Sequence, residues 1–199
     1  MTSCLCQQRT FAPLDIAETD YRRIVATHGV MSGFGELVSC FRKTTSRTED
    51  AFCGPFIQQE STQSIGRTPG VRIWWPLIIL LEVAYMFKYP ERNGRTDGAD
   101  PWSLRQMAVY QQHNRYTGQD TWIVLMCRHR SLVWDRLVHL LRPGVPTISS
   151  TLTSPRLHEE LLTCHISDWR PYMLHYEETV SQTVGVIVRV AMCSGGPDN

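Results

Sequence analysis

The stretch "DPWSLRQMAVYQQHN", residues 100–114, decides the fold and begins like a strand, with Pro101 ahead of alternating side chains. Even-numbered residues from Trp102 to Tyr110 would share one face, and odd-numbered residues from Ser103 to Gln111 the other. Each face mixes apolar with hydrogen-bonding side chains, which is typical of a strand covered on both sides. The stretch therefore predicts a central strand of a sheet.

Two further strands are expected next to it. In "LLEVAYMFKY" (80–89), residues alternate between a face from Leu81 to Tyr89 and a face from Glu82 to Lys88, the pattern of a half-buried strand. The apolar run "TWIVLMC" (121–127) is the third. Turn-forming residues fill both connections. Three strands joined by modest loops predict an antiparallel meander.

Helical spacing appears on either side of this meander. Helices are expected at 15–28, 131–141, 154–166 and 167–184, with Pro171 in the first turn of the last one, and a short strand at 36–41. Residues 42–70 are rich in Ser, Thr, Gln, Gly and Pro and are expected to form a long polar surface loop. The predicted fold class is α+β: an antiparallel or mixed sheet with packed helices and a C-terminal helical arm. Residues 1–166 would form the domain, and residues 167–199 a truncated stalk-like helix and tail.

Composition indicates an ordinary globular protein. The 199 residues are 42% apolar and 20% charged, and the net charge of +1 argues against a nucleic-acid partner. The seven cysteines have scattered spacings, and the N-terminus lacks the pattern of a signal peptide. Reduced thiols and a cytoplasmic location follow as expectations.

No segment is expected to span a membrane. The most apolar run, "VRIWWPLIILLEVAYMF" (71–87), contains Arg72, Pro76 and Glu82, and the apolar tail at 183–193 contains Arg189. A spanning helix needs roughly 20 predominantly apolar residues. Both runs are too short or too broken.

The motifs of common enzymes and metal sites are missing from the sequence. It has no Gly-x-Ser-x-Gly elbow, no Walker or GxGxxG loop and no CxxC pair. We therefore expect no catalytic residue, no bound cofactor and no metal site. An enzyme site assembled by the fold from His113, Cys127 or His129 and a carboxylate is the competing interpretation.

Arg105 lies within the predicted central strand and needs a partner there, because an unpaired buried charge is costly. Glu82 and Glu91 in the neighbouring strand region are the two candidates. The polar residues of the stretch are interpreted as internal ties between strands and not as a ligand site.

Residues 80–176 resemble the N-terminal soluble domain of CorA-like transporter proteins of filamentous fungi. The "PWSLRQ" block is the most specific part of this resemblance. The residues that carry it, interpreted as structural, are Glu82, Tyr85, Tyr89, Glu91, Gly94, Arg95, Trp102, Arg105, Gln106, Tyr110, Trp122, Trp169 and Tyr172.

The resemblance implies a cytoplasmic α/β sandwich whose last helices lead into a long stalk, with two membrane helices and a Gly-Met-Asn pore signature in full-length members. It also implies divalent cations, magnesium above all, as the transported ions. This sequence contains no Gly-Met-Asn, and no stalk of useful length is expected beyond Val184. The expected role is a non-catalytic regulatory or assembly domain without the pore. The alternative is a stand-alone interaction module with no tie to transport.

An apolar stripe runs along the last predicted helix. It consists of Trp169, Tyr172, Met173, Tyr176 and Val180. An exposed apolar stripe on a helix favours docking to another helix. Residues 169–184 are therefore predicted to mediate self-association.

Overall fold

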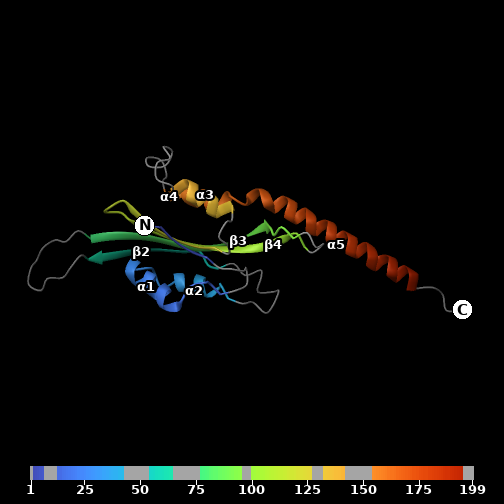
Figure 1. Cartoon of the computed structure of the whole chain (residues 1–199), viewed down its shortest axis with the longest axis horizontal. Coiled ribbons are helices and arrows are strands. Elements are labelled where there is room, and N and C mark those ends of the chain that lie inside the picture. The colour runs from blue at the N-terminus through green and yellow to red at the C-terminus, as the bar shows by residue number, and fades with distance from the viewer. Residues whose placement is uncertain are drawn as a thin grey trace, which may run out of the picture.

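The computed structural model describes residues 2–6, 13–42, 54–64, 77–95, 100–126, 132–141 and 154–194. The elements, drawn in Figure 1, are in chain order β1 (Thr2–Cys6), α1 (Glu18–His28), α2 (Phe34–Ser39), β2 (Ile57–Ser64), β3 (Leu77–Arg92), β4 (Trp102–Asn114), β5 (Gln119–Met126), α3 (Leu132–Leu141), α4 (Ser154–Thr163) and α5 (Ile166–Ser194).

The strands form one five-stranded sheet in the order β1-β5-β4-β3-β2. Strands β2 to β5 pair antiparallel, which confirms the predicted meander, whereas β1 joins β5 in parallel, with Thr2 opposite Trp122. The sheet is therefore mixed, and β4 lies at its centre. The α+β prediction is confirmed. Strand β1 was not predicted, because five residues are too few to show a clear alternation.

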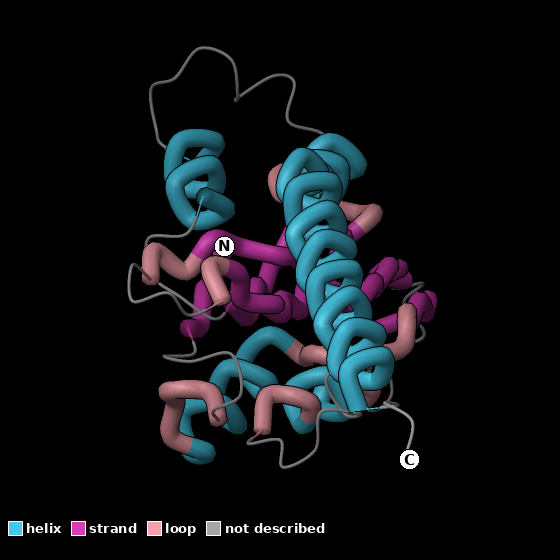
Figure 2. Tube along the Cα trace, turned by 90° about the vertical axis from the view of Figure 1, so that its right-hand side faces the viewer, coloured by secondary structure: helices cyan, strands magenta, loops and turns pink. Residues whose placement is uncertain are grey.

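Helices cover both faces of the sheet (Figures 1 and 2). Helices α1 and α2 lie on one face, which we call face A, and α3, α4 and the start of α5 lie on the other, face B. In β4, Ala108 and Tyr110 belong to the core on face A, while Met107 and Val109 belong to the core on face B. The alternation predicted for this strand is confirmed.

The helices supply the rest of each core at helical spacing. On face A the fully buried side chains of Phe34 and Leu37 stand three residues apart in α2. On face B, Leu157 and Leu161 of α4 stand four apart, and Val133 and Leu137 of α3 do likewise. Residues three and four apart share one side of a helix, so each short helix buries one stripe.

The short strand expected at 36–41 is wrong, because this segment contains most of α2. Phe34, Leu37 and Phe41 are all buried, and their spacing of three and four residues matches a helix. Helix α1 begins at Glu18, three residues later than expected, and ends at His28 as expected. The next residue, Gly29, has a φ of 59°, the left-handed conformation that glycine adopts at low cost.

The long polar loop expected at 42–70 is also wrong in part, because Ile57–Ser64 form strand β2 at the edge of the sheet. An edge strand with polar side chains on both faces lacks the apolar alternation that would identify it. Residues 43–53 and 65–70 lie outside the described residues.

Helix α5 is longer than expected. It begins at Ile166 and runs for 29 residues to Ser194, ten residues past Val184, so the expectation of no useful stalk beyond Val184 is wrong. Pro171 lies in the second turn, not the first. Once a helix has nucleated, each added residue gains one backbone hydrogen bond, so even the β-branched run after Gly185 continues it. Helix α5 leaves the body of the protein and forms an arm (Figure 1).

Candidate functional site

The carboxylate of Glu82 is a buried hydrogen-bond hub on face A. Only 2% of this residue is exposed. Glu82 Oε1 accepts hydrogen bonds from Tyr110 Oη at 2.6 Å and from the backbone N–H of Met31 at 3.1 Å. Glu82 Oε2 accepts from Gln59 Nε2 at 2.8 Å and from Ser61 Oγ at 3.1 Å. The hub therefore joins β2, β3, β4 and the segment that connects α1 to α2.

The chemistry of this hub is structural. The groups around Glu82 are N–H and O–H donors, and such donors satisfy a carboxylate where a metal would need further oxygen or nitrogen acceptors. Burial and the hydrogen bond to Glu82 raise the pKa of Tyr110, so its hydroxyl stays protonated and remains a donor. Gln112 Nε2 contacts the same cluster, at 3.2 Å from Tyr110 Oη. We conclude that Glu82 fixes the face A layer to the sheet.

Arg105 pairs with Glu91, one of its two predicted partners. Arg105 Nε lies 3.1 Å from Glu91 Oε2, and the two side chains are 14% and 16% exposed. Gln106, on the opposite side of the same strand, donates from Nε2 to the backbone carbonyl of Cys40 at 3.4 Å. Arg105 thus ties β4 to β3, and Gln106 ties β4 to the segment after α2.

A chain of hydrogen bonds connects α4 to the sheet on face B. Tyr85 Oη lies 2.8 Å from His158 Nδ1, and His158 Nε2 lies 2.8 Å from Gln111 Oε1. Gln111 Nε2 donates to Asp120 Oδ1 at 2.8 Å, and His113 Nδ1 lies 3.0 Å from the same oxygen. Because Gln111 offers its carbonyl to His158, the imidazole donates from Nε2 and accepts from the Tyr85 hydroxyl at Nδ1. Both ring nitrogens of His158 therefore have a hydrogen-bond partner.

This arrangement favours a neutral His158. Burial lowers the pKa of His158, and burial raises the pKa of Tyr85. The imidazole also lies against the ring of Trp122, with centroids 4.6 Å apart. A neutral histidine satisfied at both nitrogens and packed against an aromatic ring acts as a structural contact between helix and sheet.

The turn between α4 and α5 rests on Tyr89. The imidazole of His165 stacks on the Tyr89 ring, with centroids 4.1 Å apart and planes at 15°. His165 Nδ1 lies 2.9 Å from Asp168 Oδ2 in the first turn of α5, while His165 Nε2 is buried and has no hydrogen-bond partner. Tyr89 and His165 therefore set the point at which the arm begins.

Asp100 holds the next two turns of α5. Its carboxylate accepts hydrogen bonds from the Tyr176 hydroxyl and, at 2.9 Å, from the backbone N–H of Trp102. His175 Nε2 lies 3.6 Å from Asp100 Oδ1. The ring of Trp102 meets Tyr172 edge to face, with 5.9 Å between centroids. The Arg92 guanidinium lies over the Trp102 ring, 5.1 Å from its centroid. We call these contacts of α5, from Tyr89 to Tyr176, the arm root.

The signature residues thus do not converge on one site. Glu82 and Tyr110 belong to the hub on face A, Tyr85 and Trp122 to the His158 chain, and Tyr89, Trp102 and Tyr172 to the arm root. Gly94 and Arg95 lie in the exposed turn after β3, where Gly94 has a φ of +70°, and Trp169 is 40% exposed on the arm. Sequence reasoning missed His158, His165 and Asp100, which carry no recognisable motif.

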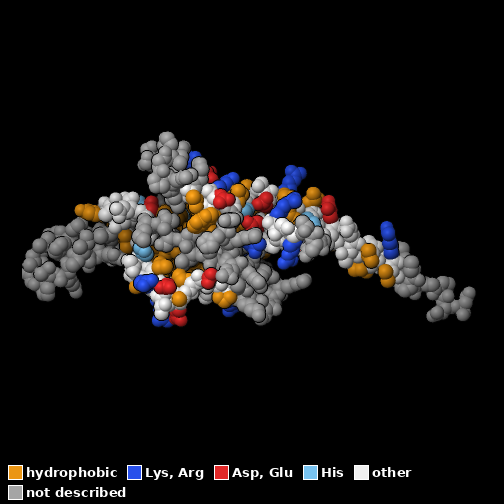
Figure 3. All heavy atoms as spheres, in the orientation of Figure 1, with side chains coloured by type: hydrophobic (Ala, Val, Ile, Leu, Met, Phe, Trp, Pro, Cys, Tyr) orange, Lys and Arg blue, Asp and Glu red, His pale blue; other side chains and the backbone are white. Residues whose placement is uncertain are grey.

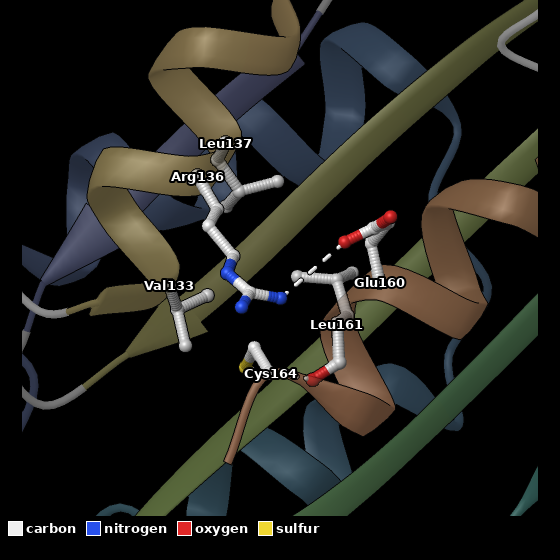
Figure 4. A pocket seen from close by; sticks show the side chains of 6 residues that line it. All are labelled: Val133, Arg136, Leu137, Glu160, Leu161 and Cys164. Atoms are coloured by element: carbon white, nitrogen blue, oxygen red, sulfur yellow. Dashed lines mark hydrogen bonds and ion pairs between the residues drawn. The ribbon is translucent and has the colours of Figure 1, made fainter.

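A small pocket between α3 and α4 is shown in Figure 4. It is lined by Val133, Arg136, Leu137, Glu160, Leu161 and Cys164. Arg136 Nη1 lies 3.5 Å from Glu160 Oε2. Burial raises the pKa of the Cys164 thiol to about 11, and its Sγ donates to the Leu161 carbonyl at 3.2 Å. A protonated, buried thiol is a poor nucleophile and a poor metal ligand, so the pocket offers no activated group.

Within the described ranges, no group of three or more His, Cys, Asp or Glu side chains is placed to hold a metal ion. Cys127 and His129, considered above for an assembled enzyme site, lie outside those ranges. The helices in the described part of the chain are too short or too polar to cross a membrane.

Comparison with known proteins adds one finding. A family model described as CorA-like transporters matches residues 6–187, which is most of the chain. No curated protein and no solved structure matches the chain.

Proposed function

The chain belongs to the CorA-like transporters, and from this premise we propose that it is a non-catalytic, cytoplasmic assembly or regulatory domain of a divalent-cation transport system. In this proposal the α/β body is a rigid platform, and the arm α5 joins copies of the chain together. Magnesium is the proposed ion, on the strength of family membership alone. The observation that carries the proposal is the apolar surface of α5.

That surface follows a heptad pattern. Steps of three and four residues connect Ile166, Trp169, Met173, Tyr176, Val180, Thr183, Ile187 and Val190. Several of these side chains are largely exposed on the single chain, among them Met173 at 59%, Val180 at 61% and Ile187 at 61%. Apolar residues at this spacing form the seam of coiled coils, in which each helix covers the seam of its neighbour. Apolar side chains are visible along the arm in Figure 3.

Residues beside the seam widen it. Val184 is 52% exposed and Val186 60%, and they occupy the positions that flank a heptad seam, where charged residues are usual in two-stranded coiled coils. A continuous row of exposed apolar side chains is typical of a surface that another polypeptide covers. Association of several copies through α5 would cover them.

The test is the oligomeric state of the full chain by sedimentation velocity. The chain should associate, and Val180→Glu with Ile187→Glu should abolish the association that runs through α5, because each change buries a carboxylate in the seam. Val188→Glu is the matched control: it makes the same substitution at a 45% exposed position away from the seam and should leave association intact. A wild-type chain that stays monomeric at high concentration would overturn the role of the arm.

The ion is tested in cells that depend on the chain. Cells that express Val180→Glu with Ile187→Glu should take up less magnesium than cells that express the wild type or Val188→Glu, measured with a fluorescent magnesium indicator. If the double variant has lost association through α5 in vitro and magnesium uptake is nevertheless equal, a role in transport is rejected and an interaction module unrelated to it is favoured.

A further inference from the structure

Strand β2 (Ile57–Ser64) is the last strand of the sheet, and no described strand pairs with its outer edge. In the strand order of the sheet β2 pairs with β3 on one side and has no neighbour on the other, as far as the described residues go. Its sequence "IQQESTQS" contains neither Pro nor Lys, the residues that commonly protect an edge strand from pairing. Gln58, Glu60 and Thr62 are exposed.

The direction of the backbone groups on this edge follows from a contact on the far side of β3. The N–H of Arg115 donates to the carbonyl of Ile79 at 3.0 Å, so the polar groups of Ile79 point toward β4. Backbone groups alternate along a strand, so those of Leu80 and Glu82 point toward β2. Their register partners in β2 are Ser61 and Gln59.

In an antiparallel pair, the backbone groups of two directly opposed residues either bond to each other or both point away from the partner strand. The backbone groups of Ser61 and Gln59 therefore bond to β3, and those of the residues between and beside them point outward. The outer edge presents the N–H and C=O groups of Gln58, Glu60 and Thr62. A row of alternating donors and acceptors at strand spacing is matched by another extended strand.

We infer that β2 is a second self-association surface, on which β2 of another copy of the chain pairs antiparallel and continues the sheet across a twofold axis. This inference goes beyond the proposed function, because it involves neither α5 nor ion transport. The occupant is a second copy because the strand complements itself: its side chains are neutral apart from one carboxylate, and one register keeps the two carboxylates apart.

The register is set by Glu60. A twofold axis at Glu60 would place Glu60 opposite its own copy, and like charges directly opposed destabilise a strand pair. A twofold axis at Ser61 instead places Glu60 opposite Thr62 of the second copy, twice per dimer, and retains the longest overlap between the two strands that avoids opposed carboxylates. Glu60 and Thr62 then form the bonded pairs that exchange backbone hydrogen bonds.

This register makes a charge test possible at an exposed position. In the full chain carrying Val180→Glu and Ile187→Glu, which removes association through the arm, the dissociation constant of the remaining dimer is measured by sedimentation velocity. Thr62→Glu places like charges opposite each other and should raise this constant about fivefold, and Thr62→Lys should lower it by a similar factor. The double variant Glu60→Lys with Thr62→Glu restores opposite charges and should recover the association that Thr62→Glu loses.

A second measurement reports on the backbone itself. As protein concentration rises, amide hydrogen exchange at Gln58, Glu60 and Thr62 should become slower. Exchange at Gln59 and Ser61, whose backbone groups already bond to β3, should be slow at every concentration. A chain that remains monomeric in the arm-variant background, or a dimer whose constant responds equally to Thr62→Glu and Thr62→Lys, would overturn the inference. Slow exchange that appears only when a different polypeptide is added would also overturn it, since the occupant would then be another protein.

Discussion

At the scale of single residues, Glu82 shows how a charged side chain can serve the fold. The sequence offered Glu82 and Glu91 as alternative partners for Arg105, and the structure pairs Arg105 with Glu91 at 3.1 Å. Glu82 instead accepts hydrogen bonds from four neutral donors on three separate segments. The pairing in β3 and β4 could be anticipated from strand alternation. The donors from Met31 and Gln59 could not be anticipated. Met31 lies in the connection between α1 and α2, and Gln59 lies in β2, within the segment expected to be a polar loop.

Replacing Glu82 by glutamine is therefore expected to lower the free energy of unfolding by about 2 kcal/mol or more, because the new amide group turns N–H toward buried donors and leaves them unsatisfied. Chemical denaturation followed by circular dichroism measures the change. Glu60→Gln, the same substitution on the exposed face of β2, is the matched control and should change stability by less than about 0.5 kcal/mol. Equal effects of the two variants would show that the hub contributes nothing to stability.

His158 gives the fold a dependence on pH. Burial lowers its pKa in the folded protein below the value of about 6.5 expected for the unfolded chain. The unfolded state therefore takes up a proton more readily, and stability rises with pH in this range. The contribution of a neutral His158 is complete above about pH 6.5 and is lost as pH falls from there toward the folded pKa.

The expected result is a difference in unfolding free energy between the wild type and His158→Gln that shrinks as pH falls from about 7.5 to about 5. The variant carries no titrating group at this position, so the other histidines cancel in the comparison. Denaturation at a series of pH values measures it, and NMR titration of the His158 ring reports its pKa directly. A constant difference over this range would contradict a lowered pKa.

At the scale of elements, regular patterns were predictable and edges were not. Strands β3 and β4 alternate in sequence, β5 is a short apolar run, and the helices that pack on the sheet repeat apolar residues at intervals of three and four. Strand β2 is polar on both faces, and its place in the sheet depends on hydrogen bonds from Gln59 and Ser61 to Glu82. Helix α2 is short, and its apolar residues Phe34 and Leu37, with Phe41 just after it, span too few turns to distinguish a helix from a strand without the layer against which they pack.

Asp100 is predicted to hold α5 in place without supporting the sheet. Asp100→Ala removes the acceptor for the Tyr176 hydroxyl and for the backbone N–H of Trp102. Amide exchange in the turns of α5 around His175 should quicken by about tenfold, which corresponds to the loss of one or two hydrogen bonds. Exchange in the centre of β4 should not change.

Glu177→Ala provides the control for this element, because it removes a carboxylate from an exposed position of the same helix and leaves the arm root intact. If both variants quicken exchange equally, the effect comes from the helix itself and not from its contacts with the sheet.

At the scale of the whole molecule, one sheet separates two cores. Phe34 lies in the core on face A, and Leu161 lies in the core on face B. Since both cores share the strands β3, β4 and β5, we expect the two layers to unfold together in a single transition.

Phe34→Ala and Leu161→Ala should each lower the free energy of unfolding by about 3 kcal/mol. In the double variant the two losses should add to within about 0.5 kcal/mol, because the sites lie on opposite faces and share no contact. Tryptophan fluorescence and far-ultraviolet circular dichroism should give coincident denaturation curves. Two separate transitions would mean that the layers fold independently.

Among the described residues, the contacts of the arm root hold α5 as far as Tyr176, and this gives the helix the geometry of a lever. From Tyr176 to Ser194 the helix extends roughly 27 Å without further support from the described sheet. A rotation of about 10° at the root would therefore carry the far end through about 5 Å, close to one helical turn. Small adjustments around Asp100 and Tyr89 are thus amplified into a sideways displacement of several ångströms at the far end of the helix.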